Sequence, residues 1–353
     1  MMKLNDLAQR AGEWLRGCGP RSEIVISSRM RLARNVAGFA FLARCSPGDR
    51  RTLESNIRDV ILGSGIGDPL LYVDLEQAPE LDRQLLVERH LISRPHAVVE
   101  GARGVAITSD ETVSIMVNEE DHLRIQVLRS GLQLEDAWRQ INQIDDQLEQ
   151  KLPWAFHPQF GYLTACPTNV GTGLRVSVMV HLPALKLTGE IEKVFRAAKE
   201  LRLAVRGLYG EGTEATGDFY QVSNQTTLGR TEEQILHEFQ DAILPRIIDY
   251  ELQARRSLLN ERTAALDDKI FRALAILRGA RMLSSEEVLF LLSHVRLGVH
   301  LGRLPEIDIN RVNELFLQTQ AAHLQKLTGK KLEGDARRIA RADFVRERLN
   351  PTA

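Results

Sequence analysis

Two apolar runs typical of β-strands, ETVSIMVN and HLRIQVLRSG, follow each other in residues 111–131 and are separated only by Glu119, Glu120 and Asp121. Strands joined by so short a turn pair with each other as an antiparallel hairpin. An all-helical fold is therefore excluded for this part of the chain. The hairpin also places three consecutive acids beside strands that should be buried, where acids are least expected.

The chain from residue 104 to residue 253 alternates strand-like runs with helical ones. GVAITSD precedes the hairpin, and a helix is expected over LEDAWRQINQIDDQLEQKL. Then follow TACPTNVGTGLRVSVMVHLP, a helix over GEIEKVFRAAKELRL, and two strands around GLYGEGTEATGDFYQVSN. Short turns between adjacent strands favour an antiparallel sheet with helices packed on it, an α+β fold.

The pattern becomes helical near residue 253 and stays so. SSEEVLFLLSHVRLG begins with a capping box, in which Ser284 caps a helix and Glu287 follows three residues later. INRVNELFLQTQAAHLQKL repeats apolar residues at helical spacing, and GDARRIARADFVRERL predicts a basic final helix. Since 353 residues exceed one simple core, we expect two domains, residues 1–253 with the sheet and residues 254–353 all helical.

Composition limits the class of partner. The net charge of −1 argues against a general attraction to nucleic acid or an acidic membrane, so an anion site needs a local group of arginines. Cys18, Cys45 and Cys166 form no CxxC pair, which argues against a zinc site and a disulfide framework. No apolar run reaches membrane-spanning length, and the first residues lack the apolar segment of a secretory signal. We expect a reducing, cytoplasmic location.

The hairpin acids have two interpretations. A run of acids in a turn is ordinarily a solvated surface loop. Here Arg124 follows directly on a strand, and a second isolated acid, Glu211, lies in the glycine-rich segment RGLYGEG. Two carboxylates on strand-end loops that converge on one cleft would hold a planar cation and accept a proton from it.

Five arginines flank these loops or lie on the strands beside them. Arg29 and Arg31 are two residues apart in SSRMRLAR, so on an extended chain they face the same side. Arg124, Arg175 and Arg206 each lie beside a loop and next to an apolar run. A single arginine of this kind is ordinarily a surface residue. Five together favour a phosphate-binding site, because a guanidinium combines a permanent charge with a fork that fits phosphate oxygens.

Cys166 lies in TACPTNVGTG, a segment of turn residues with many hydrogen-bond donors. A lone cysteine is ordinarily inert packing. A tight polar turn is also a setting that presents a reactive thiolate. The residues alone leave both interpretations open.

NEEDHLR, CPTNVGTGLR and RGLYGE, in this order and spacing, resemble the catalytic motifs of the ATP:guanidino phosphotransferases, the family of arginine and creatine kinases. SSRMRLARN and VERHLIS resemble more closely the bacterial protein-arginine kinases of the McsB type. The resemblance covers residues 20–253 and, more weakly, the helical remainder. Small-molecule kinases of the family carry a large helical domain before these motifs, whereas SSRMR begins here at residue 27, which favours the protein-kinase branch.

The resemblance implies roles for individual residues. Glu120 matches the carboxylate that orients the acceptor guanidinium and serves as the catalytic base. Glu211 matches its partner on the other side, and Cys166 matches a thiol that contacts the guanidinium. The implied donor is ATP with Mg²⁺, no protein-held metal is expected, and segment 210–217 is expected to close over the nucleotide. The implied nucleotide-binding residues are Ser27, Ser28, Arg29, Met30, Arg31, His90, Arg124, Arg175, Val176, Ser177, Val178, Met179, Arg206, Gly207, Leu208, Tyr209, Gly210 and Glu211.

In protein-arginine kinases the final helical domain carries an Arg-Asp-x-x-Arg-Ala motif that binds phosphoarginine allosterically. Alignment on RADFVRERL places this motif at Arg337, Arg338, Arg341 and Ala342. Arg338 replaces the acid that would recognise the guanidinium half of the ligand. A basic, solvated helix face is the alternative interpretation.

The implied activity is ATP-dependent phosphorylation of arginine side chains in proteins. The family role would be to mark proteins for a Clp-type unfoldase and protease, or to regulate a stress-response repressor. The implied partners are protein substrates, a zinc-binding activator protein and a second copy of the chain in a homodimer, without direct nucleic-acid or membrane binding. Two alternatives remain, a kinase of free arginine or another small guanidine, and a non-catalytic phosphoarginine-binding adaptor.

Overall fold

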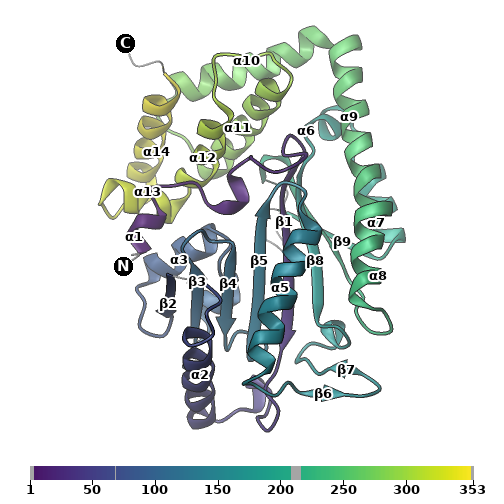
Figure 1. Cartoon of the computed structure of the whole chain (residues 1–353). Coiled ribbons are helices and arrows are strands. Elements are labelled where there is room, and N and C mark those ends of the chain that lie inside the picture. Colours follow the sequence, from purple (N-terminus) through teal and green to yellow (C-terminus); the bar gives the residue numbers. More distant parts are fainter. Residues whose placement is uncertain (1–3, 68, 208–215, 351–353) are drawn as a thin grey trace.

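The computed structural model describes residues 4–67, 69–207 and 216–350. At its centre, the described residues form an eight-stranded antiparallel sheet in the order β2-β3-β4-β5-β1-β8-β10-β9 (Figure 1). The strands are β1 (Val25–Arg34), β2 (Leu70–Asp74), β3 (Gly104–Thr108), β4 (Val113–Val117), β5 (Leu123–Ser130), β8 (Leu174–His181), β9 (Leu203–Gly207) and β10 (Phe219–Asn224). A separate small hairpin consists of β6 (Phe156–His157) and β7 (Gly161–Tyr162). The expected antiparallel α+β fold is confirmed.

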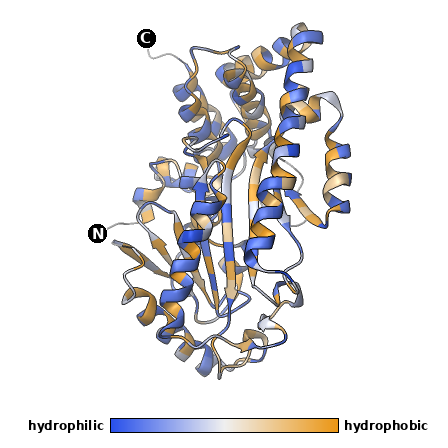
Figure 2. Ribbon diagram, turned by 45° about the vertical axis from the view of Figure 1, so that its right-hand side comes forward, coloured by the Kyte–Doolittle hydropathy of each residue, from blue (hydrophilic) through white to orange (hydrophobic). Residues whose placement is uncertain are grey.

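Helices cover one face of this sheet. α5 (Leu134–Glu149) lies across β1 and β5, and α2 (Pro47–Leu62) lies across β2, β3 and β4, both in front of the sheet in Figure 1. Figure 2 shows that the outward sides of these helices are mostly hydrophilic, as expected for amphipathic helices on a core. The other helices of this part are α1 (Leu4–Leu7), α3 (Glu80–Glu88), α4 (Arg94–Val98), α6 (Pro183–Thr188), α7 (Ile191–Glu200) and α8 (Glu232–His237).

β1 lies in the middle of the sheet, between β5 and β8. The hydroxyl of Ser28 accepts a hydrogen bond of 2.9 Å from the backbone N–H of Gln133, where α5 begins. Met30 is fully buried in the same core as the apolar stripe of α5. Since successive side chains of a strand alternate between the two faces, Arg29 and Arg31 face away from α5.

Arg34, the last residue of β1, forms a buried ion pair with Asp145 of α5. Its Nη2 atom lies 2.6 Å from the Asp145 carboxylate, and its Nη1 atom donates to the carbonyl of Thr172 at 2.9 Å. The guanidinium carbon lies 3.5 Å from the centre of the Tyr162 ring. One arginine thus connects the central strand, the covering helix, the small hairpin and the segment that leads into β8.

The remaining helices are α9 (Leu244–Glu261), α10 (Thr263–Gly279), α11 (Ser285–His300), α12 (Ile309–Gln318), α13 (Ala321–Thr328) and α14 (Gly334–Leu349). The expected capping box is confirmed, since Ser284 and Glu287 bond each other's backbone N–H groups at the start of α11. The apolar run 309–327 forms two helices, with a break at Thr319 and Gln320. The expected boundary at 253/254 falls inside α9. Within the described ranges, no helix has the length and apolar character that a membrane span requires.

Hydrogen bonds from side chains of α11 connect this helix to the sheet and to the segment before β1. The guanidinium of Arg296 donates to the carbonyl of Ser22 at 2.5 Å and contacts Nδ1 of His181 at 2.9 Å. Burial and the nearby charge of Arg296 hold the pKa of His181 well below its usual value. The neutral ring therefore accepts from Arg296 at Nδ1 and donates to the hydroxyl of Ser293 at Nε2, over 2.9 Å. Ser293 in turn donates to Asp218 at 2.7 Å, at the start of β10.

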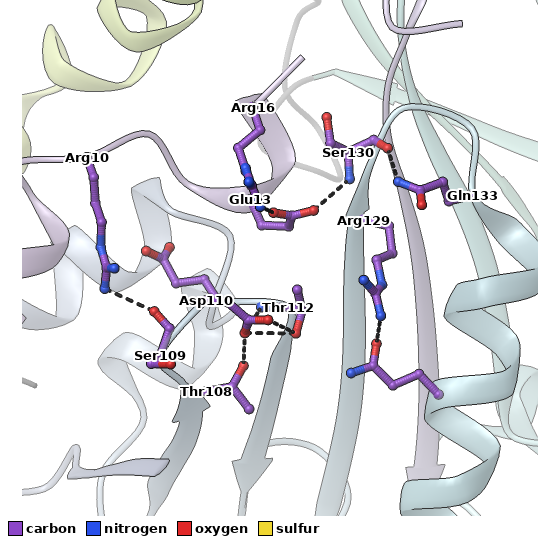
Figure 3. Close-up of polar contacts among 12 residues, drawn as sticks. Arg10, Glu13, Arg16, Thr108, Ser109, Asp110, Thr112, Arg129, Ser130 and Gln133 are labelled. Carbon is purple, nitrogen blue, oxygen red and sulfur yellow. Dashed lines mark hydrogen bonds and ion pairs between the residues drawn. The ribbon is translucent and has the colours of Figure 1, made fainter. Parts of the chain in front are cut away.

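The segment before β1 crosses the end of the sheet (Figure 3). Arg10 donates to the carbonyl of Ser109 at 3.0 Å, in the turn between β3 and β4. Glu13 accepts from the backbone N–H of Ser130 at 3.2 Å, at the end of β5. These contacts hold the buried Trp14 against the face of the sheet that α5 leaves uncovered.

We expect Asp145→Ala to lower the free energy of unfolding by about 3–5 kcal/mol, because it leaves the charge of Arg34 buried without a partner. Asp146→Ala is the matched control, since this neighbouring acid is exposed and should cost less than about 0.5 kcal/mol. Urea unfolding followed by circular dichroism measures both values. Equal midpoints for the two variants would show that the pair contributes nothing.

Candidate active site

A cleft of about 980 Å³ lies on the face of the sheet opposite α5. Its walls come from β1, β4, β5, β8, β9 and β10, from residues 87–95, and from the turn before β8, residues 164–173, which we call the cysteine turn. Eight residues implied by the sequence lie in its lining: Arg29, Arg31, His90, Glu120, Arg124, Cys166, Arg175 and Arg206. The volume is typical of a ligand-binding cleft.

The register of the sheet gathers the five arginines. Arg31 of β1 pairs with Arg175 of β8, and Ala33 of β1 pairs with Arg124 of β5. On the β8 side, Gln221 of β10 pairs with Arg206 of β9. Directly opposed residues on neighbouring strands point to the same face. The arginines therefore come from β1, β5, β8 and β9 but share one surface.

The guanidinium of Arg29 is held by neutral polar groups. Its Nη2 atom donates to the side-chain oxygen of Gln221 at 2.6 Å, and its Nε atom donates to the hydroxyl of Ser177 at 3.3 Å. Arg175 donates to the hydroxyl of Ser223 at 2.9 Å. These contacts orient the two guanidinium groups without neutralising them.

The cationic groups repel one another. Burial lowers the pKa of Arg29 to about 9, and the charges of Arg175, Arg124 and Arg206 add to this effect. Burial, together with Arg29 and Arg124, also holds the pKa of Arg31 below its usual value. Arginine normally remains charged in proteins, so this part of the cleft is suited to a polyanion that compensates the charge.

The hairpin acids Glu119 and Glu120 share Arg124 but differ in burial. The side chain of Glu119 is 4% exposed and lies 2.8 Å from Arg124, whereas that of Glu120 is 46% exposed and lies 3.0 Å from it. Burial alone would raise the pKa of Glu119, but Arg124 and a hydrogen bond from Ser93 lower it below the usual value. Burial and the charges of Asp121 and Glu119 raise the pKa of Glu120, against the opposing effect of Arg124. Of the two acids that line the cleft, Glu120 is thus the more exposed and binds a proton more readily.

The next two residues of the hairpin turn are structural. The buried carboxylate of Asp121 accepts hydrogen bonds of 2.7 Å from the side chain of Asn35 and from the backbone N–H of Ala165. His122 bonds Asn35 through its backbone N–H at 3.0 Å and contacts the carbonyl of Ala40 through its ring at 3.0 Å. Asp121 therefore ties the turn that carries Glu120 to the residue before Cys166.

The cysteine turn holds its thiol at the cleft. A short 3-10 turn over Pro167–Asn169 follows Cys166, and the Sγ atom lies 3.0 Å from the hydroxyl oxygen of Thr168. Thr227 follows the end of β10. Its hydroxyl donates to the carbonyl of Thr168 at 2.9 Å and so stabilises the turn. Both Cys166 and Glu120 lie at the end of the cleft where β1 ends and β5 begins.

His90 lies beside the arginines in a strained backbone conformation, with φ at 60°. Its ring packs edge-on against Trp14 at 4.5 Å between ring centres. Burial, together with the charges of Arg29 and Arg94, lowers the pKa of His90 to about 3. The ring is therefore neutral near pH 7 and adds no charge to the cationic part of the cleft.

The structure separates the other implied nucleotide-binding residues into three groups. Ser27, Ser177 and Met179 line a small hollow next to the cleft, together with Trp14. Ser28, Met30, Val176 and Val178 alternate with the cleft-lining residues and are buried in the sheet, and Val178 also borders the small hollow. Gly207 ends β9, and Leu208, Tyr209, Gly210 and Glu211 lie outside the described residues, as does most of segment 210–217.

Several cleft residues had not been identified from the sequence. Glu119, Ser93, Gln126, Asn169 and Gln221 all line the cleft. Glu119 is adjacent to Glu120, and only its burial against Arg124 distinguishes the two. Gln221 could have been found from the alternation of DFYQVSN, but that requires the pairing of β10 with β8, which is not local in sequence.

The motif residues on α14 lie away from the cleft. Arg341 is 3% exposed, and its guanidinium donates to the carbonyls of Thr319 at 2.8 Å and Leu283 at 2.9 Å. Because Thr319 lies between α12 and α13, the hydrogen bond from Arg341 stabilises the break between these helices. Ala342 is fully buried, whereas Arg338 is exposed and lies 3.4 Å from Asp335. Arg337, partly buried, lies one turn before Arg341 on the same helix.

Two family models match the chain. Residues 53–254 match the ATP:guanido phosphotransferase C-terminal catalytic domain, and residues 263–353 match the protein-arginine kinase McsB C-terminal domain. Among solved structures, the duplicated taurocyamine kinase of Schistosoma mansoni is similar with a TM-score of 0.61 and 28% identity, covering 72% of this chain and 36% of that one. A lombricine kinase is similar with a TM-score of 0.59 and 26% identity, covering 70% of this chain and 75% of that one.

Curated relatives match over nearly the whole length. A protein-arginine kinase of Symbiobacterium thermophilum is 51% identical over 99% of this chain and 100% of its own length. The protein-arginine kinase of Bacillus subtilis is 42% identical over 99% of this chain and 96% of its own length. The resemblance inferred from the motifs is thereby confirmed. The chain belongs to the ATP:guanido phosphotransferase family, in the branch whose members are called protein-arginine kinases.

Proposed function

We propose that this protein transfers the γ-phosphate of ATP to the guanidinium of arginine side chains in other proteins. The observation that carries the proposal is the distribution of charge along one cleft. Arginines of β1, β8 and β9 line one part of it, while a half-exposed carboxylate, Glu120, paired with Arg124, and a thiol, Cys166, lie at the end where β1 ends. A triphosphate fits the first region and a cationic acceptor fits the second.

The proposed orientation of the two substrates follows from the strand register. The phosphates lie over Arg29, Arg31 and Arg175, and the acceptor enters where β1 ends, beside Glu120 and Cys166. Mg²⁺ would arrive with the phosphates, since kinases hold it by phosphate oxygens, waters and one or two carboxylates. Among the described residues, no group of three or more His, Cys, Asp or Glu side chains is placed to hold a metal on its own.

In this mechanism the acceptor arrives as a charged guanidinium, which is a poor nucleophile. The Glu120 carboxylate orients it and takes one N–H proton as the nitrogen attacks the γ-phosphorus. The N–P bond forms, the bond to the β-phosphate oxygen breaks, and ADP leaves. Arginines stabilise the charge on the transferring group, so positioning and fixed charge supply most of the catalysis. Glu211 is proposed as the second carboxylate and Cys166 as the thiol that aligns the guanidinium plane.

Curated relatives that are 42–51% identical over nearly the whole chain are called protein-arginine kinases. Their names support the proposal that the acceptor is an arginine of a protein and not free arginine. Incubation with γ-labelled ATP and either casein or free arginine tests this point. Acid-labile label on casein is the expected result. Label on free arginine alone would make the protein a small-guanidine kinase, and nucleotide binding without any transfer would make it an adaptor.

The wider role is proposed from the family resemblance. It comprises phosphoarginine binding at the motif Arg337, Arg338, Arg341 and Ala342, assembly as a homodimer in the cytoplasm, a zinc-binding activator and delivery of marked proteins to a Clp-type unfoldase. Since the guanidinium of Arg341 is engaged by two backbone carbonyls, Arg337 is the better placed of the two motif arginines for a phosphate. Binding of phosphoarginine to Arg337→Ala, measured by calorimetry, tests that assignment.

We expect Glu120→Gln to lower kcat by about 10²- to 10⁴-fold, the usual contribution of a general base, and to leave ATP binding unchanged. The base must be ionised, so kcat/KM of the unmodified protein falls as the pH falls through the pKa of Glu120. Because burial raises the pKa of Glu120, the midpoint of the acid limb lies above the ordinary pKa of a glutamate. Glu149→Gln, on the exposed end of α5, is the control. A residual Glu120→Gln activity with the same acid limb would contradict the assignment.

We expect Arg175→Gln to weaken ATP binding by about tenfold or more, since one charge-assisted contact contributes more than 1.4 kcal/mol. The same change removes a charge that repels Arg29 and Arg31 as well as the hydrogen bond to Ser223, so the two effects oppose and the unliganded protein should lose less than about 1 kcal/mol of unfolding free energy. Calorimetric titration with ATP and urea unfolding without ligand measure the two effects. The control is Arg196→Gln on the exposed side of α7, which should change neither. A loss of more than about 3 kcal/mol without ligand, beyond what one hydrogen bond to a charged group contributes, would contradict the repulsion.

A further inference from the structure

The hairpin β6–β7 exposes large aromatic side chains. Phe156 is 57% exposed and Phe160 is 49% exposed. Each of these rings contacts a neighbouring ring. The ring of Phe156 packs edge-on against Tyr162 at 5.4 Å between ring centres, and the ring of Phe160 stacks on His157 at 4.8 Å. Rigid, exposed aromatic side chains of this kind are the residues that most often anchor a partner at an interface.

The hairpin is attached to the acceptor end of the cleft through its backbone. Tyr162 and Gly171 form an antiparallel bridge, with an N–H···O distance of 2.8 Å from Tyr162 to Gly171. Gly171 has a φ of +115°, and a Cβ at this position would lie 2.8 Å from the Cα atom of Leu228. The cysteine turn is thus held between the aromatic hairpin on one side and Leu228, itself 50% exposed, on the other. We call Phe156, Phe160 and Leu228 the rim patch.

The hairpin and the cysteine turn themselves carry no formal charge, although Glu149 and Glu232 of other segments lie near Tyr162. Residues 152–174, which include the hairpin and the cysteine turn, contain no Asp, Glu, Lys or Arg, although these make up 26% of the chain. At the base of Figure 1, β6 and β7 lie beside the lower ends of β1 and β8. The cleft itself is lined by arginines and glutamates, so the change from charged cleft to uncharged rim occurs at the cysteine turn.

We infer that the rim patch binds the apolar residues that flank the acceptor arginine in an extended segment of a substrate protein. This inference rests on the proposed function and adds to it the means by which the protein selects its acceptors. An arginine whose guanidinium lies between Glu120 and Cys166 requires its own backbone to leave the cleft at the rim. In an extended chain each residue advances about 3.3 Å, so the next two or three residues on one side reach over the hairpin. Apolar side chains there would cover the exposed rings, whereas a folded domain offers no such extended segment.

The test uses two blocked heptapeptides with a single central arginine, one flanked by leucine and phenylalanine and one flanked by serine. For the unmodified protein, KM for the apolar peptide should be at least tenfold lower than KM for the serine peptide. The double variant Phe156→Ser/Phe160→Ser should raise KM for the apolar peptide about tenfold. It should leave KM for the serine peptide, KM for ATP and kcat unchanged.

The matched control is Phe271→Ser, which removes an equally exposed phenylalanine from α10, 49% exposed. It should leave every constant unchanged. Equal KM values for the two peptides with the unmodified protein, or the same loss in the control as in the double variant, would overturn the docking role while the kinase activity stands. Absence of transfer to both peptides and to casein would overturn the proposed function and the docking role together. Circular dichroism of each variant verifies that the fold is intact, and a Leu228→Ser variant replaces the double variant if the latter unfolds.

Discussion

The pairing of β1 with β5 on one side and β8 on the other determines where charge lies in this molecule. That pairing places Arg31 opposite Arg175 and brings Arg124 onto the same face, so cationic groups far apart in the sequence become neighbours. Their mutual repulsion and burial lower the pKa of Arg29 and Arg31, which means that the unliganded cleft is an unfavourable arrangement of charge. The opposite face of the same strands compensates, because it packs α5 and contributes a continuous apolar core. The central strand thus stabilises the fold on one face and prepares an anion site on the other.

The acidic run in the hairpin turn has a physical explanation in the different environments of its three members. Glu119 is buried against Arg124 and remains ionised, and Asp121 is buried where it accepts hydrogen bonds from another loop. Glu120 alone stays half-exposed at the cleft, with a raised pKa. A single acid on this turn would have to be a buried counter-ion, a structural link and a half-exposed acid of the cleft at once. Three consecutive acids divide these tasks, and the environment of each sets which one it performs.

The local features of this fold could be predicted from its sequence, whereas its long-range features could not. The β4–β5 hairpin, the capping box at Ser284 and the basic helix α14 follow from turn length, capping residues and helical spacing within a few residues. The insertion of β1 between β5 and β8 pairs segments about a hundred or more residues apart, for which no local signal exists. The role of Gln221 depends on such pairing, because its partner Arg29 lies on the distant strand β1, whereas Glu119 differs from its neighbour Glu120 only in its burial against Arg124. The break in the helical run at Thr319 is likewise set by a distant group, the guanidinium of Arg341.

The chemistry of the cleft also determines where its selectivity for acceptors must lie. In the proposed function the cleft arginines bind phosphates and Glu120 binds a guanidinium, and every arginine side chain presents the same guanidinium. Contacts inside the cleft therefore cannot distinguish one protein arginine from another. Only groups outside it meet the residues that differ between acceptors, and the hairpin that exposes Phe156 and Phe160 is bonded to the cysteine turn. Discrimination between partners comes from differences in affinity at such variable contacts. The rigid attachment of that surface to the cysteine turn means that a segment bound there would hold its arginine at a fixed distance from the thiol and the base.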